Sequence, residues 1–206
     1  MELINLFPKF LGVSELKMTN DEYDMVMKTI QGTDFDTYQL DIENNKRYPY
    51  HFLEKRNILF LKEKIENAFK EYVSEAYGTT EQKYFMTNSW LKVFYKNQSG
   101  HFHQHRNSMI SGLYYPEEVP EGQQSDLIFY DTSLERTSYF VKRDDGVDVE
   151  SFYVRPLKNR VVFFPSSLFH SVNTNLTNKK RFSIAFNFIP IGPTGKHDSY
   201  MDLKHG

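Results

Sequence analysis

The feature that most constrains the fold of this chain is a succession of short β-rich segments that begins after residue 80. The segments are separated by turn-forming residues, and no long helical stretch interrupts them. They span residues 83–95, 108–115, 125–130, 138–142, 151–155, 160–164 and 181–190. Short strands joined by turns are typical of closed or double-layered antiparallel folds. We therefore expect a β-sandwich or an eight-stranded jelly roll.

Two helices are predicted before this β region. The first begins at a capping box, in which the Thr19 hydroxyl and the Glu22 carboxylate each satisfy a backbone N–H, and it ends at Gly32. The second carries an apolar stripe at helical spacing over residues 57–77 and is stopped by Gly78. We expect it to cover the β layer, and the formation of a homodimer is the alternative role for this stripe.

These elements predict one α+β domain over residues 1–206, mainly β with flanking helices. An N-terminal strand and the helices, over 1–80, would pack on one face of the barrel. The jelly-roll core would span 81–190, and the polar segment 191–206 has no periodicity and is interpreted as a tail.

Composition excludes several classes of protein. The chain has 25 basic and 27 acidic residues, so its formal charge of −2 gives no indication of nucleic-acid binding. No apolar run approaches the roughly 20 residues that a membrane span needs. The absence of Cys excludes a disulfide scaffold and a thiolate metal site, and it favours a cytoplasmic location.

Three histidines lie within five residues of one another: His101, His103 and His105. Alternate side chains of an extended segment share a face, so the three imidazoles would point the same way. Neutral imidazole is the commonest protein ligand of divalent metals, and a metal relieves the repulsion between protonated rings. The cluster favours a metal site, and a His-rich surface loop is the alternative.

The C-terminal part adds one more histidine and a polar strand face. His170 follows an apolar strand and a turn. From residue 181 the side chains alternate, with Arg181, Ser183 and Asn187 on one face and phenylalanines and an isoleucine on the other. A buried Arg is costly unless an anion meets it. Arg181 therefore indicates an anion site, and an internal pair with a carboxylate is the alternative.

Taken together, these residues resemble the iron(II)/2-oxoglutarate-dependent oxygenases, and more narrowly a group of them found in bacteria and marine phages. The resemblance covers residues 84–190. It rests on His103-x-His105, Ser111-Gly112-Leu113-Tyr114-Tyr115, Phe163-Phe164-Pro165-Ser166 with His170, and Arg181-x-Ser183 with Asn187. It implies a double-stranded β-helix, which is a cupin-like jelly roll, with Fe(II) as cofactor and 2-oxoglutarate and O2 as cosubstrates.

The resemblance also implies a role for each site residue. His103, His105 and His170 would hold the metal. Arg181 would bind the distal carboxylate of 2-oxoglutarate, with the hydroxyls of Ser183 and Tyr114 beside it. Neighbours on a strand face opposite ways, so only one of the two adjacent tyrosines would point inward. Further candidates for the surroundings of the metal or the pocket lining are Asn107, Asn187, Trp90, Tyr115 and His101.

One position departs from the family pattern. His105 stands where the family has Asp or Glu, whereas non-haem iron usually has two His and one carboxylate. Asp126 or Asp131 would be a substitute carboxylate from the next strand. His101 with His103 is an alternative ligand pair, and we prefer His103 with His105 because His105 lies six residues before Ser111, as in the family.

The implied activity is that of a dioxygenase, which couples decarboxylation of 2-oxoglutarate to succinate with hydroxylation of a substrate. Two alternatives come from other classes. A non-catalytic cupin-like module would hold a metal or a small acid, which fits the missing carboxylate but leaves Arg181 unexplained. Three His and a water would also suit a zinc hydrolase. The sequence does not specify the substrate, because this scaffold serves many.

Overall fold

The computed structural model describes residues 9–38, 50–56, 58–79, 81–132 and 151–204. Within these ranges the strands form a six-stranded and a four-stranded sheet, and all of the pairings inside them are antiparallel. The larger sheet contains β1 (Gly12–Glu15), β2 (Lys83–Phe94), β4 (Ile110–Tyr115), β7 (Arg160–Pro165), β9 (Arg181–Thr194) and β10 (Met201–Leu203). The smaller sheet contains β3 (Gly100–His103), β5 (Leu127–Tyr130), β6 (Ser151–Val154) and β8 (Phe169–Val172).

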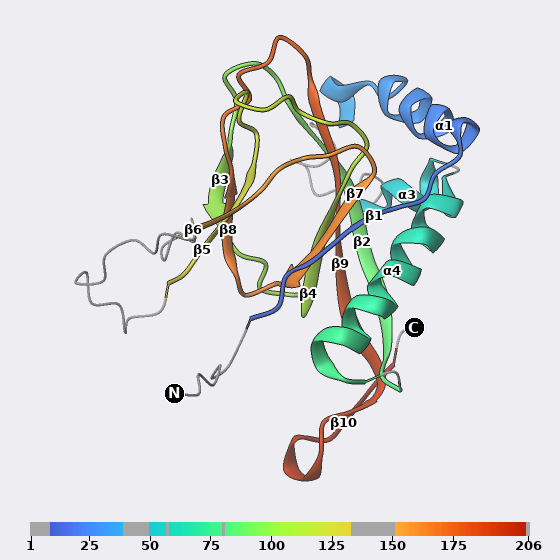
Figure 1. Ribbon diagram of the computed structural model, residues 1–206. Helices are drawn as coiled ribbons and strands as arrows, with labels where there is room; N and C mark the ends of the chain where they lie inside the picture. The colour runs from blue at the N-terminus through green and yellow to red at the C-terminus, as the bar shows by residue number, and fades with distance from the viewer. Residues whose placement is uncertain (1–8, 39–49, 57, 80, 133–150, 205–206) are drawn as a thin grey trace, which may run out of the picture.

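The two sheets face each other as the layers of a jelly-roll-like sandwich (Figure 1), so the predicted fold class is confirmed. The larger sheet has the order β1-β7-β4-β9-β10, with β2 paired to β9, and the smaller sheet has the order β3-β8-β5-β6. An apolar cluster fills the space between the sheets. Its buried members include Leu113, Tyr115, Leu127, Phe129, Val162 and Phe164.

The helices cover the outer face of the larger sheet (Figure 1). They are α1 (Asn20–Gln31), α3 (Phe52–Lys55) and α4 (Leu59–Tyr77). Phe69 of α4 stacks on Phe188 of β9 with ring centroids 3.8 Å apart, and it also contacts Phe163 of β7. The apolar stripe of α4 therefore covers the β layer, and burial of such aromatic rings is what fixes the helix in place.

The predicted ends of both long helices are present. Thr19 and Glu22 form the capping box at the start of α1, with N–H···O distances of 2.8 and 3.2 Å. Gly78 ends α4 in the left-handed conformation, at φ 64°, which glycine adopts without a Cβ clash.

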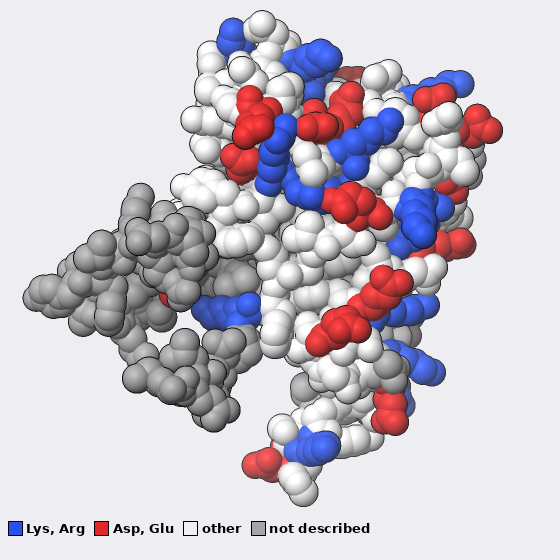
Figure 2. All heavy atoms as spheres, viewed as in Figure 1, with Lys and Arg blue, Asp and Glu red and all other residues white. Residues whose placement is uncertain are grey.

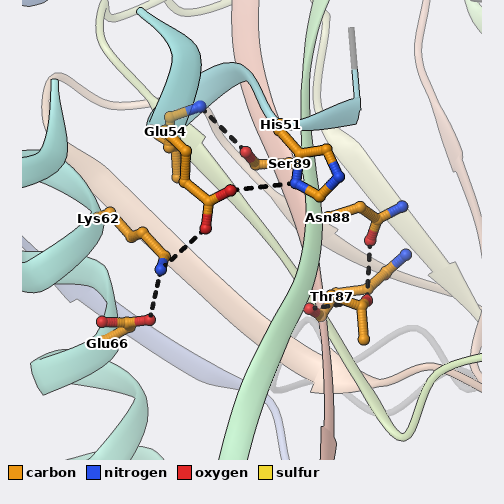
Figure 3. A network of polar contacts seen from close by, with 9 residues as sticks. His51, Glu54, Lys62, Glu66, Thr87, Asn88 and Ser89 are labelled. Atoms are coloured by element: carbon orange, nitrogen blue, oxygen red, sulfur yellow. Dashed lines mark hydrogen bonds and ion pairs between the residues drawn. The ribbon is translucent and has the colours of Figure 1, made fainter. Parts of the chain in front are cut away.

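A polar network attaches α3 to the larger sheet (Figure 3). The Leu53 N–H donates to the Ser89 hydroxyl of β2 at 3.0 Å. Glu54 contacts His51 at 3.1 Å and Lys62 of α4 at 3.0 Å. The network ties the helical layer to β2, which carries residues of the candidate site.

Gly112 marks a close approach inside the larger sheet. A Cβ at this position would collide with the ring of Phe186 and the carbonyl of Val162 on the two neighbouring strands. The glycine of the Ser-Gly-Leu-Tyr-Tyr segment is thus required by packing.

The structure differs from the sequence prediction at three strands. β3 and β8 lie in segments that the sequence analysis treated as a histidine cluster and a turn, and each is only four residues long. The segment 191–206 was predicted to be a tail, but β9 continues to Thr194 and pairs with β10 in a hairpin. The polar, glycine-containing sequence of this hairpin has no buried face, so it shows no alternation. The predicted strand over 138–142 lies outside the described residues, and the extent of a single domain over 1–206 stays a prediction.

Acidic and basic side chains are intermixed on the face shown in Figure 2, without a broad patch of either sign. No helix in the described ranges is long and apolar enough to cross a membrane.

Candidate metal and anion site

The two sheets contribute opposite walls of one pocket of about 270 Å³. The smaller sheet and the segment after β3 provide His103, His105 and His170, and the larger sheet provides Arg181 and Ser183. Residues that are up to 80 positions apart in the sequence therefore share one cavity.

The three histidines converge although they come from different segments. His103 ends β3 and is the cross-strand partner of His170 on β8. His105 lies two residues beyond β3, where its N–H donates to the Ser166 carbonyl at 2.9 Å. One nitrogen from each of the three rings lies within 4.8 Å of the others, so the group has the composition and spacing of a metal site.

Hydrogen bonds fix the tautomers of two of these rings. Nδ1 of His103 lies 2.9 Å from the His101 carbonyl, and Nδ1 of His170 lies 2.9 Å from the Leu168 carbonyl. A carbonyl oxygen only accepts, so each Nδ1 carries the proton and each Nε2 keeps its lone pair. Metal-binding histidines are oriented in this way in proteins, because the Nδ1 hydrogen bond fixes both ring and tautomer.

Burial keeps the rings neutral. Desolvation, together with the smaller effect of the neighbouring imidazoles, lowers the pKa of His170 from 6.5 to about 3 and that of His105 to about 4. The pKa of His103 is lowered as well, again chiefly by burial. The ring of His170 packs against Phe164, with centroids 4.9 Å apart. The three groups are thus unprotonated at neutral pH, which is the state that binds a cation.

A chain of hydrogen bonds supports His105 from the larger sheet. The Asn187 side-chain oxygen accepts from the Ser111 hydroxyl at 2.7 Å, and that hydroxyl lies 2.8 Å from the hydroxyl of Ser166. The Ser166 carbonyl in turn holds the His105 backbone. Asn187, a predicted neighbour of the site, therefore acts on His105 through Ser111 and Ser166.

Arg181 is buried, with only 4% of its surface exposed, and has no carboxylate partner among the described residues. Its guanidinium donates to the Ser183 hydroxyl at 3.0 Å and lies within 3.5 Å of the Ser125 carbonyl. It also lies over the ring of Tyr115 at 4.8 Å. The internal ion pair that the sequence left open as an alternative is thus not found within the described part of the chain.

Three buried polar atoms around this guanidinium lack a hydrogen-bond partner among the described residues. They are Nε of Arg181 and the hydroxyls of Tyr115 and Ser125. A buried donor without a partner costs about 1–3 kcal/mol, so native proteins keep such groups for a ligand or a function. Arg181 also lines the pocket, so its unpartnered Nε fits an anion bound in the cavity beside it.

The structure corrects the prediction for Tyr114. This side chain points toward the helices, where its hydroxyl donates to Asn159 at 2.8 Å, and it does not line the pocket. Tyr115 points to the other side of β4 and contacts Arg181. Because side chains alternate along β4, only one of the two tyrosines can face the interior of the sandwich. The sequence did not indicate which of the two it is.

The remaining predicted residues divide between the pocket and the surface. Trp90 lines the pocket with its ring 5.8 Å from that of His105. His101 is an exposed part of the pocket rim. Asn107 is exposed and is not among the lining residues, which corrects its predicted place beside the metal. Neither Asp126 nor Asp131 belongs to the cluster of potential ligands.

Sequence reasoning missed Lys92 and Ser125. Lys92 lines the pocket between Trp90 and Phe94, and the alternation of these three residues within the predicted strand 83–95 was a usable signal. Ser125 follows a turn and has a positive φ of 70°, and nothing in the local pattern indicated that its carbonyl reaches Arg181.

Comparison with known proteins agrees with this geometry. Residues 88–187, which include all five of the ligand and anion-site residues, match the family model described as "Putative 2OG-Fe(II) oxygenase". A sequence search of curated proteins gives no significant match.

Several solved structures share the fold. HygX from Streptomyces hygroscopicus, with nickel and 2-oxoglutarate bound, is 12% identical at a TM-score of 0.58, covering 87% of this chain and 81% of that chain. A prolyl-4-hydroxylase from Pseudomonas putida is 13% identical at a TM-score of 0.50, covering 86% and 83%. The 2-oxoglutarate-dependent carbocyclase SnoK, from nogalamycin biosynthesis, is 10% identical at a TM-score of 0.57, covering 87% and 79%.

Proposed function

We propose that this chain, whose residues 88–187 match the model of an iron(II)- and 2-oxoglutarate-dependent oxygenase family, is a hydroxylase with His103, His105 and His170 as its iron ligands. One observation carries the assignment of roles. The buried, uncompensated guanidinium of Arg181 shares a pocket with three neutral imidazoles. A metal site and an anion site in one cavity fit a cosubstrate that carries carboxylates at both ends.

The residues present fit the metal. Two rings have Nδ1 occupied by a carbonyl, so their Nε2 atoms are free to coordinate. His105 takes the place of the usual carboxylate, which leaves the centre more positive by one charge than a two-His-one-carboxylate site. That charge favours a dianionic cosubstrate.

Arg181 fits the far carboxylate of 2-oxoglutarate. A guanidinium pairs with a carboxylate through short, charge-assisted hydrogen bonds, and this one is already held in place by Ser183 and by the ring of Tyr115. The orphaned Nε and the Tyr115 hydroxyl are the donors that the carboxylate would satisfy.

Iron(II) and 2-oxoglutarate together supply the oxidising chemistry, in which O2 is consumed, 2-oxoglutarate becomes succinate and CO2, and a substrate C–H becomes C–OH. The chain binds and orients these partners. Apolar side chains of Leu127, Phe164 and Val172 line the same pocket and would reduce the contact of the bound partners with water.

The test is an anaerobic titration with iron(II) followed by 2-oxoglutarate, in which the visible metal-to-ligand charge-transfer band is recorded. We expect a band in the wild-type protein and none in His170→Ala. Arg181→Ala should need at least about ten-fold more 2-oxoglutarate, because a charge-assisted pair is lost. His197→Ala and Arg155→Ala, outside the pocket, are the matched controls and should behave as wild type. Succinate formation under air then measures turnover.

The three-imidazole set also suits a non-catalytic metal-binding module or a hydrolytic zinc site. Neither explains why the pocket holds a desolvated Arg181. If iron binds and no band appears at saturating 2-oxoglutarate, the cosubstrate assignment is wrong and one of these two functions takes its place.

We also propose the cytoplasm as the location. The chain has no Cys, and a reducing compartment keeps iron in the divalent state.

A further inference from the structure

A second cation, Lys92, faces the pocket. Along β2, Trp90, Lys92 and Phe94 point to the inner side, and their cross-strand partners on β9 are Ala185, Ser183 and Arg181 respectively. Lys92 therefore lies beside the arginine on the wall opposite the histidines. Lys92, His103 and His105 all line this one pocket, so the ammonium group faces the same cavity as the imidazoles.

The ammonium group of Lys92 has no hydrogen bond or ion pair with any described residue. The pocket lining contains no Asp or Glu in the described part of the chain, whereas it contains two cationic side chains. Both β-strand neighbours on its face are aromatic, and the side chain is partly buried. An ammonium that is partly desolvated beside a second cation is unfavourable until an anion joins it.

With iron(II) and one dianion bound, the pocket would still carry a net positive charge. Iron(II), Arg181 and Lys92 would bring four positive charges to a pocket whose three imidazoles are neutral. The 2-oxoglutarate dianion cancels two of them. The excess comes from His105, which stands in place of a carboxylate, and from Lys92.

We infer that Lys92 binds an anionic group, a carboxylate or a phosphate, of the molecule that the enzyme oxidises. This inference rests on the proposed function and adds the charge class of the substrate to it. Lysine is a compact point charge that suits either anion. The rings of Trp90 and Phe94 flank the ammonium and would contact the apolar part of the same molecule.

The chain contains a reporter for this site, because Trp90 is its single Trp and lies two residues from Lys92. Protein loaded with nickel(II), which does not support oxidation, and with 2-oxoglutarate is titrated with benzoate, with phenyl phosphate, and with benzamide as the neutral analogue of benzoate. Trp90 fluorescence gives the dissociation constant of each probe. We expect at least one of the two anions to bind about ten-fold or more tightly than benzamide.

Lys92→Met should remove this preference, and Lys92→Arg should keep it. Lys83→Met is the matched control, since Lys83 is an exposed lysine on the same strand, and it should behave as wild type. Benzoate and phenyl phosphate together distinguish a carboxylate from a phosphate site. The inference is wrong if wild type binds benzamide as tightly as both anions, or if it binds neither anion. It is also wrong if the preference for an anion survives in Lys92→Met.

The affinity for 2-oxoglutarate distinguishes the role of Lys92 from that of Arg181, which is proposed to bind the cosubstrate. We expect Lys92→Met to change the dissociation constant of 2-oxoglutarate by less than about two-fold, while Arg181→Met weakens it at least ten-fold. If both variants lose affinity for 2-oxoglutarate equally, Lys92 binds the cosubstrate, and the inference that it binds the substrate is wrong.

Failure of the proposed function has a different signature. If wild type binds neither nickel nor 2-oxoglutarate, the oxygenase assignment fails. The anion preference is then measured in metal-free Arg181→Met protein, in which Lys92 is the remaining cation of the described pocket lining. If the preference for the anions persists in Arg181→Met and is lost when Lys92→Met is added, the anion site at Lys92 stands without the oxygenase function. If Arg181→Met shows no such preference, both the oxygenase assignment and the anion site are wrong.

Discussion

At the scale of single residues, the site consists of polar groups that folding removes from water and leaves without a counter-ion. Arg181 is buried without a carboxylate, and His105 and His170 are held neutral. Each of these costs stability in the empty protein, and each is what a bound ion would compensate. The residues that destabilise the empty fold are therefore those that carry the proposed chemistry.

Arg181→Met tests this opposition between stability and function. An apolar side chain of similar length removes a desolvated charge, so the metal-free variant should be as stable as wild type or more stable by about 1 kcal/mol. Its affinity for 2-oxoglutarate should fall at least ten-fold. Urea unfolding and the charge-transfer titration measure the two quantities. A loss of several kcal/mol would show that the arginine is structural.

The depressed histidine pKa values predict how the stability of the metal-free protein depends on pH. The pKa is 6.5 for an ordinary histidine, about 4 for His105 and about 3 for His170 in the folded protein. Between these pH values the two histidines bind protons in the unfolded chain but not in the folded one. The unfolding free energy should therefore be level above pH 6.5 and fall as the pH is lowered toward 4.

His170→Gln should flatten this fall, because one of the titrating groups is gone. Denaturant unfolding at pH 7.5 and pH 5 gives the difference for each variant, and His197→Gln, an exposed histidine, is the control. An identical pH dependence in wild type and His170→Gln would contradict the low pKa of His170.

At the scale of elements, β9 separates two environments. Phe182, Ile184, Phe186 and Phe188 face the helices, while Arg181, Ser183 and Asn187 face the interior of the sandwich. The strand is buried on both sides, so the helices on one side stabilise a strand whose other side is polar. The structure thereby confirms the alternation predicted from the sequence.

The hydrogen-bonded chain between β9, β4 and the segment after β7 predicts a positioning effect. Ser111→Ala leaves the Asn187 amide oxygen without its donor and breaks the link to Ser166, whose carbonyl holds His105. We expect nickel affinity to fall several-fold, with a loss of stability of about 1–3 kcal/mol.

Ser108→Ala is the matched control for this effect. Its hydroxyl donates to the Ile110 and Phe188 carbonyls and has no link to His105, so nickel affinity should stay unchanged. Calorimetric titration with nickel measures both variants. Equal affinities in Ser111→Ala and wild type would show that the chain of hydrogen bonds serves stability alone.

At the scale of the whole molecule, the proposed ligands join the two layers of the sandwich. His103 and His170 belong to the smaller sheet, and Arg181 belongs to the larger one (Figure 1). A cosubstrate that spans metal and arginine would connect the sheets across the pocket, and its binding free energy adds to that of folding.

Thermal unfolding should show this connection. Nickel alone should raise the melting temperature, and 2-oxoglutarate should raise it further only when nickel is present. A ligand at one hundred times its dissociation constant stabilises the fold by about 2.7 kcal/mol. Loss of both shifts in His170→Ala would support the shared site. A rise with 2-oxoglutarate that is equal with and without nickel would contradict it.

The sequence was sufficient wherever a pattern is local. The capping box at Thr19 and Glu22, the stripe of α4 and the two faces of β9 were all predicted, because each depends on residues a few positions apart. Short strands such as β3 and β8 were missed, since four residues give too little periodicity to be recognised.

The sequence by itself predicted a β-sandwich or jelly roll and an inward-facing Arg181, and its motifs, through the family that they resemble, indicated the candidate ligands, because alternation and motif order are local to the chain. Only the tertiary structure decided which tyrosine of the adjacent pair faces Arg181 and that Lys92 shares the cavity. These facts depend on how strands far apart in the sequence pair and on the phase of each pleat. Long-range register fixes both, and no local pattern encodes it.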